Sequence, residues 1–84
     1  MARKEYNGHE SWNAWNVALW IGNDEWLYNL AMECIKLPRK DGRPVTAKYA
    51  ATRFNRLCGE TKTPDGAKYS HRSVMLAMQG LMEE

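Results

Sequence analysis

The stretch SWNAWNVALWIGNDEWLYNLAMECIKL, from Ser11 to Leu37, decides the fold, because it holds all four tryptophans and most of the branched apolar residues. Its apolar residues recur at helical spacing, which predicts two helices that meet at a tight corner. The corner falls at Gly22, Asn23 and Asp24, three residues that favour turns and helix ends. We expect this pair of helices to form the core, with its indole rings directed inward.

The two helices of this stretch have clear expected limits. The first should span residues 12–21 and begin after Ser11, whose hydroxyl can accept a hydrogen bond from the first turn. The second should span residues 24–37 and end before Pro38, because the residue that precedes a proline resists helical geometry. Asn16 shares the apolar face of the first helix, so we expect its amide to bind the backbone of a loop or a helix end. That face comprises Trp12, Trp15, Leu19 and Trp20.

The rest of the chain predicts two more helices. One should span residues 47–58 after Thr46, with Leu57 directed inward, and the other should span residues 71–82 after Ser70. Turn signals at 41–42 and 63–66 separate them. The fold class is therefore all-α, a compact bundle of about four helices. Residues 1–10 should form a short polar arm, and residues 11–84 a single helical domain, since 84 residues make one domain.

The charge distribution is uneven, although the net charge is only +2. The segment from Glu5 to Glu33 contains five acids and no lysine or arginine. The segment from Lys36 to Arg56 contains seven bases and only one acid, Asp41. Such a split indicates a charged partner, or else two halves that attract each other as they dock. The candidate partner-binding residues are Lys36, Arg39, Lys40, Arg43, Lys48, Arg53 and Arg56. A secondary candidate is an acidic face of Asp24, Glu25 and Glu33.

Several classes of function lack a signal in the sequence. The two histidines and two cysteines make no paired metal-ligand spacing, and no glycine-rich phosphate loop occurs, so we expect no metal, no cofactor and no enzymatic activity. Cys34 and Cys58 are expected to be buried free thiols. No apolar run is long enough for a membrane span or a signal peptide, which favours a cytoplasmic protein. The tryptophans could instead stack on bases or sugars, with Trp26 the most exposed of them.

Three segments of the sequence carry a resemblance. They are residues 6–8 (YNG), residues 15–31 (WNVALWIGNDEWLYNLA) and residues 63–66 (TPDG). Together they resemble a family of uncharacterised small proteins of bacteriophages and plasmids with a W-N-V-x-L-W-I-x-N-D-E signature. Trp26 departs from the commonest pattern, which has a smaller residue such as glycine there. The resemblance implies a phage or mobile-element origin and supplies no catalytic residue.

Three functions follow as hypotheses. By analogy with anti-CRISPR proteins, the first is a phage-type inhibitor that binds a host protein or ribonucleoprotein complex, such as a CRISPR effector, stoichiometrically. The second is a small accessory protein that binds nucleic acid through the basic segment 36–56. The third is a structural or regulatory helical module without a charged partner. The chain is expected to be a monomer or a homodimer in each case.

Overall fold

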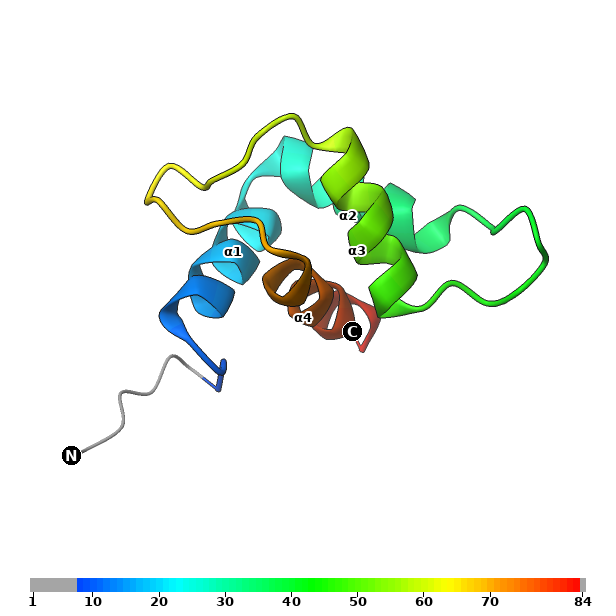
Figure 1. Ribbon diagram of the computed structural model, residues 1–84, viewed down its shortest axis with the longest axis horizontal. Helices are drawn as coiled ribbons and strands as arrows, with labels where there is room; N and C mark the ends of the chain where they lie inside the picture. Colours follow the sequence, from blue (N-terminus) through cyan, green and yellow to red (C-terminus); the bar gives the residue numbers. More distant parts are fainter. Residues whose placement is uncertain (1–7, 84) are drawn as a thin grey trace.

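The computed structural model describes residues 8–83 and contains four helices (Figure 1). They are α1 (Trp12–Asn23), α2 (Glu25–Lys36), α3 (Ala47–Leu57) and α4 (His71–Met82). The described part of the chain has no β-strand; Lys62 and Lys68 form an isolated antiparallel bridge. The all-α prediction is thus confirmed. The expected limits differ from the observed ones by one or two residues in α1, α2 and α3, and they agree in α4.

Each helix begins at a side chain that satisfies a free backbone N–H of the first turn. The oxygen atoms of Ser11, Asp24, Thr46 and Ser70 each accept from the N–H three residues further on, at 3.0, 3.0, 3.1 and 3.2 Å. Asp24 has two roles, because its own N–H also donates to the Trp20 carbonyl and closes α1. One residue therefore separates α1 from α2. The corner is narrower than expected because residues 22 and 23 remain in α1.

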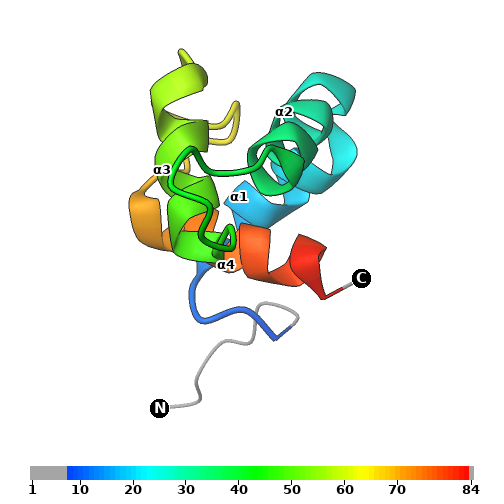
Figure 2. The ribbon, with the colours of Figure 1, turned by 90° about the vertical axis from the view of Figure 1, so that its right-hand side faces the viewer.

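The helices pack in chain order around one core. α4 makes its largest contacts with α3 and α1, α2 packs against α1 and α3 and more lightly against α4, and α1 and α3 do not touch. Two long connections complete the fold (Figures 1 and 2). The connection between α2 and α3 projects from the bundle, whereas the connection between α3 and α4 passes back over α1.

The core is built mainly from aliphatic residues and one phenylalanine rather than from indoles. Trp12 and Trp26 are 40% and 56% exposed, and Trp15 and Trp20 are only half-buried, so the predicted inward indoles are wrong. Small alanine side chains on α2, α3 and α4 fill much of the interior, and the rings that are buried there are those of Phe54 and Tyr69. The largest fully buried side chains are those of Phe54, Ile21, Met78, Val17, Val74, Asn16 and Cys34.

Leu57 also differs from its prediction. It is 59% exposed, because it is the last residue of α3 and the chain turns away directly after it. The next residue, Cys58, is buried instead, and both Cys58 and Cys34 are free thiols, as expected. The pKa of the Cys34 thiol is raised, chiefly by burial.

A buried polar network joins α1 to the connection between α3 and α4. The amide of Asn16, 2% exposed, donates to Asp65 Oδ2 at 2.9 Å and accepts from the Thr63 hydroxyl at 2.6 Å. The Trp20 indole N–H donates to the same Asp65 oxygen at 2.9 Å. Hydrogen bonds from Asn16 and then from Trp20 hold the pKa of Asp65 below its usual value. Asn16 thus binds loop side chains, whereas we had expected backbone groups.

A second asparagine of α1 binds the backbone of the same connection. Asn13 Oδ1 accepts from the Lys68 N–H at 2.8 Å, and Asn13 Nδ2 donates to the Lys68 carbonyl at 2.9 Å and to Ser73 Oγ at 2.7 Å. Two residues before α1, Glu10 pairs with Arg72 through two hydrogen bonds of 2.9 and 2.7 Å. Glu10 of the expected polar arm is therefore tied to α4, and residues 1–7 lie outside the described part of the chain.

Candidate functional site

An open cleft lies between the C-terminal end of α2, the connection that follows it, and one face of α3. Its volume is about 680 Å³. Four of the seven predicted cations line it, and we call it the basic cleft. Its lining residues are Leu37, Pro38, Arg39, Lys40, Asp41, Tyr49, Arg53, Arg56 and Leu57.

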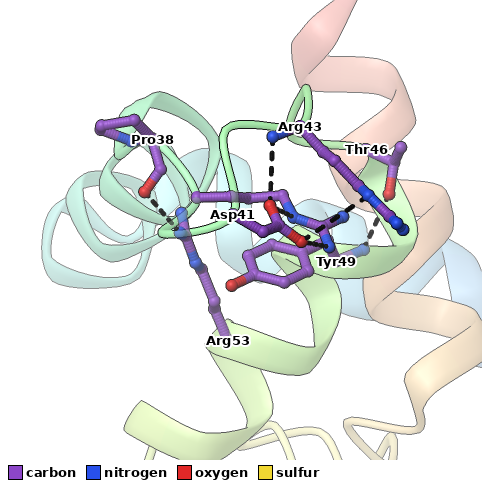
Figure 3. A network of polar contacts seen from close by, with 7 residues as sticks. Pro38, Asp41, Arg43, Thr46, Tyr49 and Arg53 are labelled. Atoms are coloured by element: carbon purple, nitrogen blue, oxygen red, sulfur yellow. Dashed lines mark hydrogen bonds and ion pairs between the residues drawn. The ribbon is translucent and has the colours of Figure 1, made fainter.

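Arg53 has a structural role in this cleft. From α3 its guanidinium donates to the carbonyls of Cys34 at 3.1 Å and of Leu37. It also donates to the carbonyl of Pro38 at 3.0 Å (Figure 3). These carbonyls belong to the last turn of α2 and the residues after it, where backbone acceptors lack partners within the helix. The positive charge also lies at the negative end of the α2 dipole. Arg53 therefore fastens α2 to α3 and is not a free cation.

Arg39 is also engaged within the chain. Its guanidinium makes a bidentate pair with Asp41, with distances of 2.6 and 3.0 Å. Asp41 additionally accepts the Arg43 N–H at 3.1 Å, so that one carboxylate organises the whole turn. The hydrogen bond from Arg39, followed by that from the Arg43 backbone, lowers the pKa of Asp41. Gly42 completes the turn with φ of +75°, a conformation that favours glycine.

Tyr49 connects the two engaged arginines. The guanidinium carbons of Arg39 and Arg53 lie 4.1 and 4.5 Å from the centre of its ring, both within the range of cation–π contacts. Sequence reasoning missed this residue. The signal was present, because Tyr49 and Arg53 are four residues apart on one helix and must therefore face the same side.

The remaining cations differ in their positions. Within residues 8–83, the side chains of Lys40 and Arg56 line the cleft without a hydrogen bond or an ion pair. The Arg43 side chain is 76% exposed, and its Nε atom lies 3.9 Å from Asp41 Oδ2. Lys48 is outside the cleft; its carbonyl accepts from the Thr52 hydroxyl on the side of α3 that faces α4. Lys36 is outside the cleft as well, on α2.

Two exposed leucines flank these cations. Leu37 is 54% exposed and Leu57 is 59% exposed, although both side chains are fully apolar. Leu37 also lines a second, shallower hollow of about 530 Å³ on the outer face of α2, together with Asn29, Met32, Glu33 and Lys36. Leu37 therefore borders both hollows.

The acidic candidate residues do not form a comparable site. Asp24 is occupied as the cap of α2, where Oδ1 accepts the Leu27 N–H at 3.0 Å. Glu25 and Glu33 are exposed on α2, and Glu33 shares its hollow with the cation Lys36.

Residues 8–83 bring together no group of three or more histidine, cysteine or acidic side chains that could hold a metal ion. Over the same residues, every helix is too short and too polar to cross a bilayer.

Fold and site together define a small all-α domain whose most developed surface feature is a cationic cleft bordered by apolar side chains. The chain belongs to a family of unknown function, DUF7249, which it matches over residues 2–84. No curated protein and no solved structure matches it significantly. Membership in this family therefore assigns no activity, and the basic cleft is the feature that indicates a function.

Proposed function

We propose that this protein binds a protein partner through the basic cleft and carries out no catalysis. One observation supports this most directly: Leu37 and Leu57, both more than half exposed, border the free cations Lys40 and Arg56. An exposed apolar patch with a polar rim is typical of a protein-binding surface. The opposed charges of the two halves of the chain would guide and orient such a partner.

The residues of the signature hold the scaffold together, so we place the partner site on other residues. Asn16 and Trp20 belong to the segment 15–31, and both bind Asp65 of the segment 63–66. These two segments carry the resemblance to small phage and plasmid proteins, and their contacts hold α1 to the connection before α4. Their role is therefore in the scaffold, which leaves the basic cleft as the candidate working surface.

The biological role that we propose is inhibition of a host defence complex, such as a CRISPR effector, by stoichiometric binding. A chain of 84 residues with an exposed cleft of cations and leucines would act by occupying a surface. Its cations would cover an acidic surface of the complex, and its leucines would anchor the contact.

A nucleic-acid-binding role is the second candidate. It is favoured by the exposed cations of segment 36–56, namely Lys36, Lys40, Arg43, Lys48 and Arg56. Against it, Arg39 and Arg53 are already engaged within the chain. Both also contact the Tyr49 ring, which makes that ring a poor platform for a stacked base.

A plasmid-interference assay tests the proposal. Cells that carry a CRISPR effector and a targeted plasmid should keep the plasmid when they express this protein. The double variant Lys40→Glu with Arg56→Glu should lose protection, whereas Lys48→Glu with Lys62→Glu, the same charge change outside the cleft, should retain it. Equal protection by both variants would exclude the cleft as the site.

Binding to DNA and RNA separates the two candidates. Fluorescence anisotropy with labelled single- and double-stranded oligonucleotides is measured at about 50 and about 200 mM salt. Micromolar affinity that falls steeply with salt would favour the nucleic-acid role. No binding at the lower salt concentration, together with protection in cells, would support protein contact.

A further inference from the structure

We infer that the basic cleft recognises an acidic segment of its partner in which an apolar side chain lies between carboxylates. This inference rests on the proposed function and specifies the ligand of the same site. The apolar side chain would lie against Leu37 and Leu57, and the carboxylates would bind Arg56 and Lys40. Such a ligand matches both kinds of residue that line the cleft.

Arg39 and Arg53 are held in place, so this part of the cleft is preorganised for binding. Arg39 is held by Asp41 and Tyr49, and Arg53 is held by the α2 carbonyls and Tyr49. Their side chains do not have to be ordered when a ligand binds, which removes part of the entropy cost of association. Arg56 and Lys40, which have no partner in the described part of the chain, remain available for charge-assisted hydrogen bonds.

Asp41 favours a carboxylate-bearing peptide over a phosphate-rich ligand. Its carboxylate lines the same cleft and is 46% exposed. A closely spaced row of phosphates would bring a negative charge next to Asp41, whereas a segment with separated carboxylates can hold them at Arg56 and Lys40, away from Asp41. The cleft therefore selects for alternating apolar and acidic side chains.

The surface is large enough for such a segment. The cleft of about 680 Å³ and the hollow of about 530 Å³ on α2 lie on either side of Leu37. Lys36 lines the second hollow and offers a further cation at that end. A short extended or helical segment could place one apolar side chain on each side of Leu37.

The test uses a short fluorescein-labelled peptide of alternating Glu and Leu residues, with the corresponding Gln and Leu peptide as its control. Affinity is measured by anisotropy, and amide ¹H–¹⁵N shifts of the full chain locate the contact. We expect the Glu peptide to bind and to shift amides of residues 36–41 and 53–57. Arg56→Glu should weaken binding about tenfold or more, since it removes a charge-assisted bond and adds repulsion.

Matched variants keep the test decisive. Lys48→Glu changes the same charge on the same helix outside the cleft, and should change affinity less than about twofold. Leu57→Ser should weaken binding without loss of folding, because the leucine is exposed. Arg56→Gln is the second variant if Arg56→Glu fails to fold.

Four results would overturn the inference: no binding of the Glu peptide, equal binding of the Gln peptide, amide shifts confined to other surfaces, or tighter binding of a single-stranded DNA oligonucleotide at the cleft. The interference assay separates this failure from that of the proposed function. Cleft-dependent protection without peptide binding would refute only the acidic ligand. Peptide binding at the cleft without protection in cells would refute only the inhibitory role.

Discussion

Replacing Asn16 with alanine should release the connection between α3 and α4 from α1. The substitution leaves the hydroxyl of Thr63, a residue that is 4% exposed, without its acceptor, which costs about 1–3 kcal/mol. The missing amide also leaves a small cavity worth about 1 kcal/mol, and the higher helix propensity of alanine offsets about half of that. The free energy of unfolding should therefore fall by about 1.5–3.5 kcal/mol.

This loss is large for a chain of 84 residues, whose total stability is expected to be about 4–13 kcal/mol. It corresponds to a fall in Tm of roughly 6–28 °C. Urea unfolding followed by far-UV circular dichroism gives the free energy, and Asn29→Ala on the exposed face of α2 is the matched control. The control should change stability by no more than about 0.5 kcal/mol. If Asn16→Ala costs no more than this control, the network does not hold the connection in place.

Three further substitutions give distinct expectations. Asn16→Asp places a second carboxylate next to that of Asp65, so the variant should be least stable relative to the native protein at neutral pH. The difference in the free energy of unfolding, measured with urea at several pH values, should shrink at low pH, where protonation relieves the repulsion. A difference that does not depend on pH would contradict this. Burial raises the pKa of Tyr69 to about 12, and its hydroxyl has no hydrogen-bond partner within the described residues. Stability should therefore fall between pH of about 10 and 12, where only the unfolded phenol ionises, and Tyr69→Phe should remove that loss without destabilising the fold at neutral pH. Arg53→Met should lower stability by about 1–3 kcal/mol in thermal unfolding and Arg56→Met by less than about 0.5 kcal/mol; equal effects would show that the carbonyl contacts of Arg53 contribute little.

Local signals explain why the helices could be predicted from the sequence. Ser11, Asp24, Thr46 and Ser70 all cap helices, because capping depends only on a side chain and the backbone three residues further on. The positions of the indoles depend instead on how closely the helices approach one another. That distance is set by Ala31, Ala50 and Ala51 on other helices, and the periodicity of α1 contains no information about it.

The candidate site was predictable in part for the same reason. The excess of cations in segment 36–56 identified the region, and four of the seven side chains do line one cleft. Their division into engaged and free cations depends on tertiary contacts: Arg53 reaches carbonyls 15–19 residues away, and Arg39 stacks on Tyr49. The apolar part of the site was missed because Leu57 continues a helical stripe that no neighbouring element covers.

The indole N–H of Trp20 is an intrinsic hydrogen-exchange probe of local opening in this protein. Its N–H donates to a carboxylate that lies 45 residues further along the chain, so this proton is protected only while α1 and the distant turn remain together. Its exchange with deuterium would record each opening of that contact, in the native protein and without a chemical label. The Trp20 ring lies outside the centre of the bundle, and its N–H therefore allows partial unfolding of the bundle to be measured.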